Sequence, residues 1–319
     1  MLKIGVFGAG HLGKIHLNLL KESKFYKIIG FYDSDIENSK KISNSLGFKS
    51  FNSPELLISN CDVIDIVTPT ISHYELAIMA INNKCHVFIE KPIAQNILQA
   101  KEIAKLAKLN NVFGQVGHVE RFNAAYKIAS SHIVNPMFIE AHRLAEFNPR
   151  GTDVPVVLDL MIHDIDIILS LVKSPIKSIK SSGVKVISNS PDIANSRIEF
   201  ENGCVANLTS SRISMKNMRK SRFFQKDAYI SIDFLTKDVE IVKMKDLTNK
   251  TAEMPMILEN AEGIKKQIFF ENPIIKKSNA ILDELESFAI SINNKSRPIV
   301  TLNDATEALI VAHKIIDSY

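Results

Sequence analysis

A glycine-rich loop, Gly8-Ala9-Gly10-His11-Leu12-Gly13, constrains the fold more than any other stretch of the chain. The apolar run 4–7 predicts a strand directly before it, and apolar residues at helical spacing predict a helix directly after it. In such a unit one glycine makes the tight turn, one lets a pyrophosphate approach the backbone, and one lets the helix pack close to the strand. The N–H groups at the helix start then face the phosphates. All six loop residues are therefore candidate contacts for a dinucleotide.

An aspartate follows the second predicted strand, which covers residues 27–32. Asp33 stands 20 residues after Gly13, near the position where an acidic side chain meets the adenine ribose in Rossmann domains. A carboxylate there accepts hydrogen bonds from both ribose hydroxyls and repels a 2′-phosphate, so we expect NAD rather than NADP. Alternatively, Asp33 or Asp35 caps the next predicted helix, 36–46.

Further strands are expected at 62–67, 85–89 and 112–116, with helices between them. With 4–7 and 27–32 they give five assigned ranges in a predicted run of six strands, and the pattern indicates a doubly wound parallel sheet. The pattern ends near Gly117-His118, so the first domain is expected to cover residues 1–118.

Polar residues follow two of these strands where the strands end. Thr68 and Pro69 come after the strand at 62–67, and Glu90 and Lys91 come after the strand at 85–89. Ligands bind at the carboxyl edge of such sheets, so all four are candidate cofactor contacts. An ammonium at Lys91 could stabilise negative charge on a substrate oxygen, although a surface Glu-Lys loop is the alternative. His73, in the first turn of the next helix, either touches the cofactor or is structural.

The second domain, residues 119–319, has the pattern of a mostly antiparallel sheet of five or six strands. The clearest candidates are 137–147, 195–200, 204–210, 228–234 and 239–244. Two helices, 280–293 and 303–318, are expected to close the chain, and the last can pack back on the first domain. One free face of the sheet would suit a subunit partner, so we expect a homodimer or homotetramer through this sheet.

An apolar helix with three polar residues is expected in the second domain. Asp159, His163 and Asp166 stand at positions i, i+4 and i+7, which share one helix face. Buried polar groups are costly unless paired, so this face indicates a site. His163 has a suitable pKa for accepting a proton, and Asp159 could orient it or hold a substrate hydroxyl. A satisfied core histidine and a metal ligand are the alternatives; the sequence shows no further ligand cluster, so we expect no metal.

The composition excludes several classes of partner. With 39 basic and 35 acidic residues the net charge is +4, which is too balanced to indicate nucleic-acid binding. No apolar run approaches the roughly 20 residues of a membrane span. The three cysteines share no metal-ligand spacing, and the chain starts directly with a strand rather than a signal peptide. We therefore expect a cytoplasmic protein with a small-molecule substrate.

Three motifs in this order and spacing resemble the glucose–fructose oxidoreductase / inositol dehydrogenase (Gfo/Idh/MocA) family of NAD(P)-dependent oxidoreductases. They are the glycine loop extended to His16, Glu90-Lys91-Pro92, and Asp159-x-x-x-His163. The resemblance implies a Rossmann domain followed by an α/β domain with a large open sheet that commonly forms the oligomer interface. It also implies that Lys91 and His163 are the catalytic pair, with Asp159 binding the substrate hydroxyl or orienting the histidine. The segment 153–157 departs from the Gly-rich approach of many relatives, so substrate access is expected to differ.

The stretch 117–123 is similar to that of the UDP-N-acetylglucosamine 3-dehydrogenase branch of this family. That similarity implies oxidation of a secondary hydroxyl of a sugar or nucleotide sugar. Arg121, Arg143, Arg150 or a local basic cluster could then meet a diphosphate, although a solvated arginine is the alternative for Arg121. The cluster, for which a solvated or oligomer-edge role is the alternative, comprises Lys216, Arg219, Lys220, Arg222 and Lys226. Two other functions stay open: an NAD-dependent glycosidase or lyase that oxidises its substrate transiently, and a non-catalytic NAD-responsive binding protein.

Overall fold

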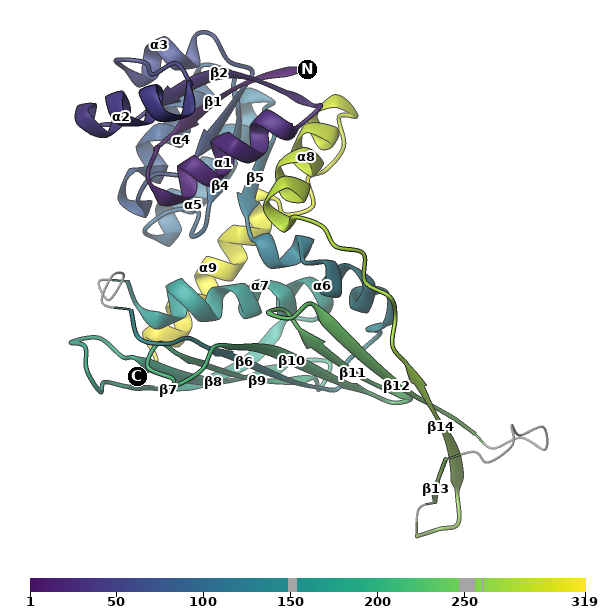
Figure 1. Ribbon diagram of the computed structural model, residues 1–319. Coiled ribbons are helices and arrows are strands. Elements are labelled where there is room, and N and C mark those ends of the chain that lie inside the picture. Colours follow the sequence, from purple (N-terminus) through teal and green to yellow (C-terminus); the bar gives the residue numbers. More distant parts are fainter. Residues whose placement is uncertain (149–153, 247–255, 260) are drawn as a thin grey trace. The chain divides into compact units, whose positions relative to one another are not determined.

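The computed structural model describes residues 1–148, 154–246, 256–259 and 261–319. The chain divides into two compact units (Figure 1). The first comprises Met1–Phe122 and Asn279–Val311, and the second comprises Asn123–Ser278 and Ala312–Tyr319. The division near residue 122 lies close to the domain boundary expected at 118, and the later division falls within the last helix.

The first unit contains a five-stranded parallel sheet in the order β2-β1-β3-β4-β5. Its strands are β1 (Leu2–Phe7), β2 (Tyr26–Tyr32), β3 (Val63–Ile66), β4 (His86–Glu90) and β5 (Gly114–Gly117). The prediction of six strands was therefore wrong by one. Outside the sheet, the edge strand β2 makes an isolated bridge from Phe31 to Ser50. A single bridge does not form a sixth strand.

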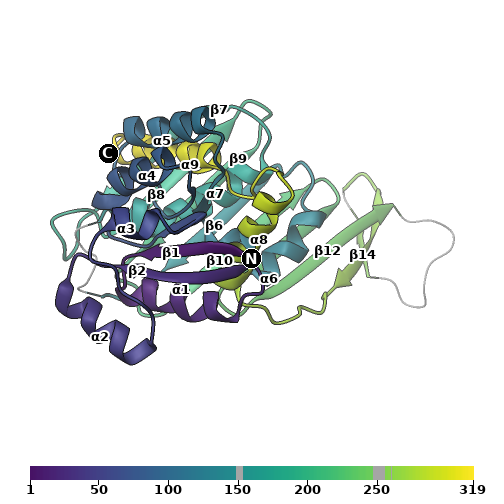
Figure 2. The ribbon, with the colours of Figure 1, turned by 90° about the horizontal axis from the view of Figure 1, so that it is seen from above.

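Helices cover both faces of this sheet (Figure 2). They are α1 (His11–Glu22), α2 (Ile36–Leu46), α3 (Pro54–Ile58), α4 (His73–Asn82), α5 (Ile97–Asn110), α8 (Ala280–Asn293) and the first part of α9 (Leu302–Ile316). On one face, Leu17 and Leu20 of α1 share a fully buried apolar cluster with Leu285 and Phe288 of α8. Helices α4 and α5 pack against each other on the other face. The late segment 279–311 is therefore part of the core of the first unit.

The second unit contains a nine-stranded, mostly antiparallel sheet in the order β13-β14-β12-β11-β10-β6-β9-β8-β7. Its strands are β6 (Phe138–Leu144), β7 (Ile176–Val184), β8 (Ile193–Phe200), β9 (Val205–Ser211), β10 (Met218–Gln225), β11 (Ala228–Asp233), β12 (Asp238–Asp246), β13 (Ile257–Glu259) and β14 (Lys265–Glu271). Five or six strands were predicted. The strands that were not predicted include β7 and β10. Their sequences contain many Lys, Arg and Ser residues and therefore lack a clear apolar alternation.

Short helices cover one face of this second sheet (Figure 1). They are α6 (Ala124–Ala129), a π-helical turn η4 (Val157–Met161) and α7 (Ile162–Leu171). The strands alternate between buried and more exposed residues, as in the central strand β6, so one face of the sheet forms the core of the unit. None of the helices among the described residues is both long and apolar enough to cross a lipid bilayer.

Candidate active site

The glycine loop connects β1 to α1, and its three glycines serve different purposes. Gly8 has φ +90°, and a Cβ atom there would lie 2.9 Å from the carbonyl oxygen of Val67, just after β3. A Cβ atom on Gly13 would collide with the carbonyl oxygen of Gly8, so α1 can pack this close only without a side chain there. A Cβ atom on Gly10 would meet nothing within 4 Å. Gly10 therefore keeps open the space at the start of the helix.

The start of α1 is suited to an anion. Its N-cap residue is Gly10, which has no side chain to accept hydrogen bonds from the first N–H groups. Those groups point out of the helix end together with the positive end of the helix dipole. The sheet order also places this loop at the switch between β1 and β3, where doubly wound sheets bind nucleotides. The loop thus has the geometry of a pyrophosphate cradle.

Asp33 is tied to the glycine loop. Its Oδ2 accepts hydrogen bonds from the N–H of Ala9 at 2.7 Å and from Asn38 Nδ2 at 3.1 Å. The cap of α2 is Asp35, whose side chain accepts the N–H of Asn38. Of the two carboxylates considered from the sequence, Asp35 therefore caps the helix. Asp33 lies beside the glycine loop and is only partly buried.

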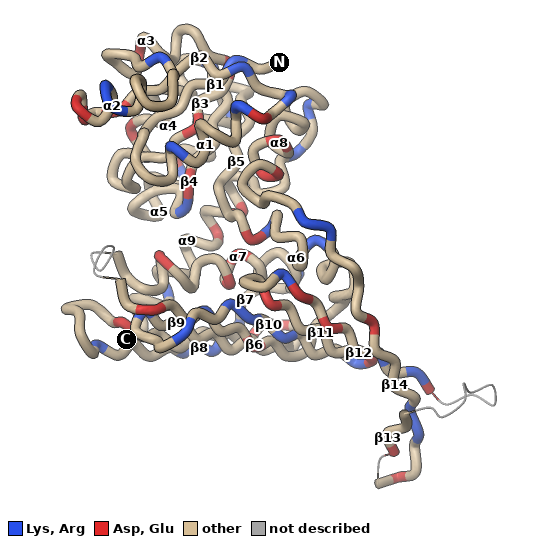
Figure 3. The backbone as a smooth tube through the Cα atoms, viewed as in Figure 1, with Lys and Arg blue, Asp and Glu red and all other residues tan. Residues whose placement is uncertain are grey.

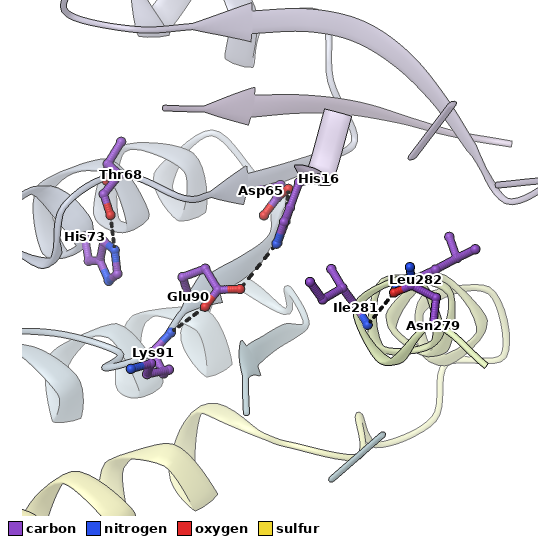
Figure 4. Close-up of polar contacts among 9 residues, drawn as sticks. All are labelled: His16, Asp65, Thr68, His73, Glu90, Lys91, Asn279, Ile281 and Leu282. Carbon is purple, nitrogen blue, oxygen red and sulfur yellow. Dashed lines mark hydrogen bonds and ion pairs between the residues drawn. The ribbon is translucent and has the colours of Figure 1, made fainter. Parts of the chain in front are cut away.

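At the carboxyl edge of the sheet, His73 joins the segments that follow β3 and β4 (Figure 4). Its Nε2 lies 2.8 Å from the carbonyl oxygen of Thr68, and its Nδ1 lies 2.9 Å from that of Pro92. The ring is 1% exposed, and burial lowers the pKa of His73 despite both contacts. This arrangement favours a structural role for His73 over a contact with the cofactor, because both ring nitrogens face the main chain. The hydroxyl oxygen Oγ1 of Thr68 is buried without a hydrogen-bond partner among the described residues.

Lys91 follows the carboxyl end of β4, and a cis peptide bond joins it to Pro92. Its main-chain N–H donates to Oε2 of Glu90 at 3.2 Å. The other carboxylate oxygen of Glu90 lies 3.4 Å from Nε2 of His16, and Nδ1 of His16 lies 2.9 Å from Oδ2 of Asp65 (Figure 4). A chain of charged groups thus runs through the first unit and ends at the residue before Lys91.

This chain of groups has unusual protonation. Burial by itself lowers the pKa of His16, but the carboxylates of Asp65 and Glu90 outweigh it, and the pKa lies well above its ordinary value. Burial raises the pKa of Asp65, and the imidazole of His16 opposes that rise. Burial also raises the pKa of Glu284 on α8 well above its usual range, with the charge of Glu90 adding to the effect. Its surroundings thus shift His16 toward the charged imidazolium and Glu284 toward the neutral acid.

In the second unit, the helix that carries Asp159, His163 and Asp166 begins with a π-helical turn. Asp159 lies within this turn, η4, and His163 lies in the first turn of α7. Turns of this kind are rare and occur frequently at functional sites. Both side chains are partly exposed, whereas Asp166 is 1% exposed. The predicted single face therefore divides into an accessible pair and a buried aspartate.

Arg143 of β6 binds the first turn of α7 through Asp164. Its Nε and Nη2 atoms donate to the two carboxylate oxygens of Asp164, each at 2.9 Å, and the arginine is only 3% exposed. Its guanidinium also lies 5.9 Å from the ring centre of Phe234. Because Asp164 directly follows His163, this bidentate pair fixes the start of the helix that carries the histidine.

The other predicted site residues lie in separate places. Arg121 is partly buried in the short turn η2 (Val119–Phe122) of the first unit. Arg150 lies outside the described residues. Lys91 belongs to the first unit, whereas Asp159 and His163 belong to the second, so their pairing stays a prediction. Within the described part of the chain, no group of three His, Cys, Asp or Glu side chains could hold a metal ion.

Comparison with known proteins identifies the family. Residues 2–118 match the model of the oxidoreductase family with an NAD-binding Rossmann fold, GFO_IDH_MocA, and residues 110–226 match the GFO/IDH/MocA C-terminal domain. The UDP-N-acetylglucosamine 3-dehydrogenase of Acidithiobacillus ferrooxidans is 32% identical over 241 residues, which are 75% of this chain and 76% of that protein. The chain belongs to the GFO/IDH/MocA family. It is an NAD-dependent oxidoreductase that acts on CH–OH groups.

Solved structures and other relatives agree with this membership. The crystal structure of UDP-N-acetylglucosamine 3-dehydrogenase GnnA from A. ferrooxidans superposes with a TM-score of 0.89 at 27% identity, covering 99% of this chain and 97% of that one. The scyllo-inositol 2-dehydrogenase (NAD⁺) of Bacillus subtilis is 26% identical over 67% of this chain and 68% of that protein. A levoglucosan dehydrogenase in complex with NADH has a TM-score of 0.84 at 17% identity, covers 99% of this chain and 96% of that one, and shares the fold.

The first unit of this GFO/IDH/MocA protein fits the cofactor of its family. The open space at Gly10 and the uncapped start of α1 suit the pyrophosphate. The buried, unpartnered Oγ1 of Thr68 at the sheet edge suits the nicotinamide half. When bound, NAD supplies the acceptor for a hydride. We expect Asp33 to hold the adenine ribose.

Three residues of the buried chain of groups were not singled out from the sequence. His16 was noted only as part of a motif, and Asp65 and Glu284 were not considered. A signal existed for Asp65, because it is an acid inside an apolar strand and is 0% exposed. Its partner could not be found that way, because His16 lies on a different element far along the chain.

Proposed function

We propose that this enzyme oxidises a secondary hydroxyl of a nucleotide sugar, with the C3 hydroxyl of UDP-N-acetylglucosamine as the preferred substrate position. The observation that carries the proposal is the likeness to the A. ferrooxidans enzyme: 32% identity in sequence, and a TM-score of 0.89 over nearly the whole of both chains. The inositol dehydrogenases are less similar, at 26% and 22% identity.

We propose the following roles for the site residues. His163 accepts the proton of the sugar hydroxyl while the hydride on the same carbon leaves for the nicotinamide, and the product is a ketone. The ammonium of Lys91 donates to the same oxygen and stabilises the negative charge that develops on it. Asp159, one turn before His163, orients the imidazole or accepts a hydrogen bond from a neighbouring hydroxyl. The partly exposed positions of Asp159 and His163 support these roles.

Among the arginines, Arg121 is the better candidate for the diphosphate of the substrate. It is partly exposed near the carboxyl end of β5, where ligands bind to parallel sheets. Arg143 is buried and holds Asp164 through two hydrogen bonds. We therefore assign Arg143 a positioning role for the catalytic helix instead of a direct contact with phosphate.

The substrate is tested by incubating the protein with NAD⁺ and a panel of compounds: UDP-N-acetylglucosamine, UDP-glucose, N-acetylglucosamine 1-phosphate and myo-inositol. We expect NADH formation with the first compound and much less with the others. UDP-N-acetylglucosamine deuterated at C3 should transfer its deuterium to the cofactor. Faster turnover of myo-inositol, or transfer of deuterium from another carbon, would refute the substrate proposal.

The catalytic pair is tested by Lys91→Ala and His163→Ala, each expected to lower kcat about 10²- to 10⁴-fold. The dissociation constant of NAD should stay within about twofold, because neither residue is assigned to the pyrophosphate or ribose. Lys101→Ala, at an exposed position on α5, is the matched control and should keep normal turnover. Normal kcat in either variant of the pair would remove that residue from the mechanism.

We further propose that the free face of the nine-stranded sheet joins two copies of the chain. Phe138, Phe224 and Tyr229 stand opposite one another on three adjacent strands, with ring centres 5.8 and 5.1 Å apart. Their sequence neighbours Ile139, Phe223 and Ile230 are fully buried on the helix-covered side, so the aromatic rings lie on the other face.

Charged groups of both signs lie among the strands of this sheet (Figure 3). They form cross-strand ion pairs such as Arg222–Glu140 and Lys220–Asp233. A face with aromatic side chains among balanced charges is suited to a second copy of itself. Phe224→Glu should convert a dimer or tetramer into smaller species in light scattering, whereas Lys101→Ala should not. A monomeric wild-type protein would refute the interface.

The use of NAD and three free cysteines favours the cytoplasm.

A further inference from the structure

The first unit encloses a cluster of four ionisable groups from four different elements. They are His16 of α1, Asp65 of β3, Glu90 of β4 and Glu284 of α8. His16, Asp65 and Glu284 are 0% exposed, and the side chain of Glu90 is 12% exposed. Buried charges are costly unless they are paired. A cluster of this kind directly before the lysine of the active site therefore requires a reason.

The geometry gives His16 both protons. Its two ring nitrogens face carboxylate oxygens, Asp65 Oδ2 at 2.9 Å and Glu90 Oε1 at 3.4 Å. A neutral imidazole donates from one nitrogen and presents a lone pair at the other, which would point at one of the carboxylates. The imidazolium form donates to Asp65 and holds its second N–H at ion-pair distance from Glu90, a contact that lacks hydrogen-bond geometry.

The carboxylate of Glu90 has three close neighbours. Oε1 faces His16, and Oε2 accepts the main-chain N–H of Lys91 at 3.2 Å. The carboxylate also lies against the backbone of Gly117 on β5, where an added Cβ atom would stand 2.6 Å from Oε1. The absence of a side chain at Gly117 therefore leaves the space that this carboxylate occupies.

We propose that His16 is a positioning residue for catalysis: as an imidazolium it holds Glu90, and through Glu90 it fixes the main chain of Lys91. The inference rests on the proposed role of Lys91. Figure 4 shows the succession from Asp65 through His16 and Glu90 to Lys91. Because a displacement of about 1 Å at a reacting group can lower the rate about 100-fold, a group that fixes Lys91 affects turnover without touching substrate.

The charges that face the cluster come from every element packed around it. Asp65 and Glu90 raise the pKa of His16, and the charges of Glu90, Asp65 and Glu120 add to the raised pKa of Glu284. Burial is the chief cause of the raised pKa of Glu284. His16 thus has the carboxyl groups of Asp65 and Glu90 beside it. Removing its charge leaves those two carboxylates uncompensated, and one of them must take up a proton at a higher pH than before.

His16→Gln tests the proposal, because glutamine can still donate a hydrogen bond but carries no charge. We expect kcat to fall about 10- to 100-fold, while the dissociation constant of NAD changes less than about twofold. The kcat of the variant should also fall steeply toward acidic pH, since protonation of Glu90 weakens its hold on Lys91. A merely structural histidine would lower thermal stability without adding this acidic limb to the pH profile.

A double variant and a matched control sharpen the test. His16→Gln/Asp65→Asn removes one charge of each sign and should recover a large part of the lost kcat. The control is His86→Gln, because His86 begins the same strand β4 but accepts a hydrogen bond from the N–H of Phe113 at the opposite edge. This control should keep the kcat and the pH profile of the wild type. Equal losses in His16→Gln and His86→Gln would overturn the proposal.

Gly117→Ala gives an independent perturbation, because it displaces Glu90 and leaves every charge in place. It should lower kcat as His16→Gln does. If the variants fail to fold, NMR of histidine side chains in the wild-type enzyme decides the point. We expect His16 to carry both ring protons at pH 7, and a neutral ring at that pH would overturn the proposal.

The failures of the two proposals are distinguishable. Normal turnover in Lys91→Ala would refute the proposed role of Lys91, and this inference would fall with it. An inactive Lys91→Ala together with normal turnover in both His16→Gln and Gly117→Ala would refute only the positioning role of His16.

Discussion

The choice of cofactor can be tested at Asp33. In the structure its Oδ2 accepts the N–H of Ala9 at 2.7 Å and an amide hydrogen of Asn38 at 3.1 Å. Asp33→Asn removes the negative charge but keeps an oxygen that can accept the bond from Ala9. The glycine loop should therefore keep its shape, and the change isolates the effect of charge on the cofactor.

The expected effect has two parts. A hydrogen bond from a ribose hydroxyl to a charged group contributes about 1.5–3 kcal/mol, so its weakening should raise the dissociation constant of NAD roughly 10- to 100-fold. A carboxylate about 4 Å from a 2′-phosphate costs about 4 kcal/mol per unit charge at an effective dielectric constant of about 20. Removing that repulsion should improve NADP binding. Together these changes should lower the ratio of the NADP dissociation constant to the NAD dissociation constant by at least about 100-fold.

Isothermal titration calorimetry with NAD⁺ and NADP⁺ measures both constants. The matched control is Asp35→Ala, because Asp35 caps α2 through the N–H of Asn38 and does not contact the glycine loop. Loss of this cap should cost about 1 kcal/mol of stability and leave the cofactor ratio unchanged. An unchanged ratio in Asp33→Asn, or tighter NADP binding by the wild type, would refute the assignment of Asp33 to the ribose.

Three further predictions concern the two units separately. Gly10→Ala should leave the melting temperature unchanged, because an added Cβ meets nothing within 4 Å, but should weaken NAD binding at least about tenfold in the same titration. Arg143→Met should cost about 3–5 kcal/mol in denaturant unfolding, because Asp164 would lose its bidentate partner inside the protein, and Arg143→Met/Asp164→Leu should recover much of this. Glu284→Gln should stabilise the protein increasingly as pH rises above the unfolded pKa. The raised pKa of the buried acid means that the folded state keeps a proton which the unfolded state releases, so wild-type stability falls with pH. A pH-independent difference in melting temperature would contradict the last prediction.

Local signals predicted the first unit well. The helix expected at 36–46 is α2, and the helix expected at 280–293 is α8, because each starts at a side-chain cap, Asp35 and Asn279 respectively. The glycine loop lies between β1 and α1, as expected for a motif that requires close contact between neighbouring segments. Each of these features depends on residues a few positions apart, and such features can be found in a single sequence.

The second sheet was less predictable because its strands are stabilised by their neighbours. Strand β10 was interpreted only as a basic cluster, yet Ser221 and Phe223 face the core and alternate with charged residues. Two of those charges, on Lys220 and Arg222, pair with acids on the adjacent strands. A strand whose exposed side is basic has no clear apolar period, and the acids that compensate it lie elsewhere in the chain.

The same reasoning applies to the buried groups behind Lys91. Asp65 lies in the strand Val63–Ile66, where a solitary ionised carboxylate would cost several kcal/mol. A buried acid of this kind therefore predicts a cation nearby, and in a sheet with helices on both faces that cation must come from a helix crossing the strand. Residues of α1, α8 and β3 share one buried cluster, and α1 contributes the histidine His16. The pairing could thus be inferred once the sheet order was known. What the order alone does not predict is that the same histidine also reaches Glu90, which couples the charge balance of the core to the position of Lys91.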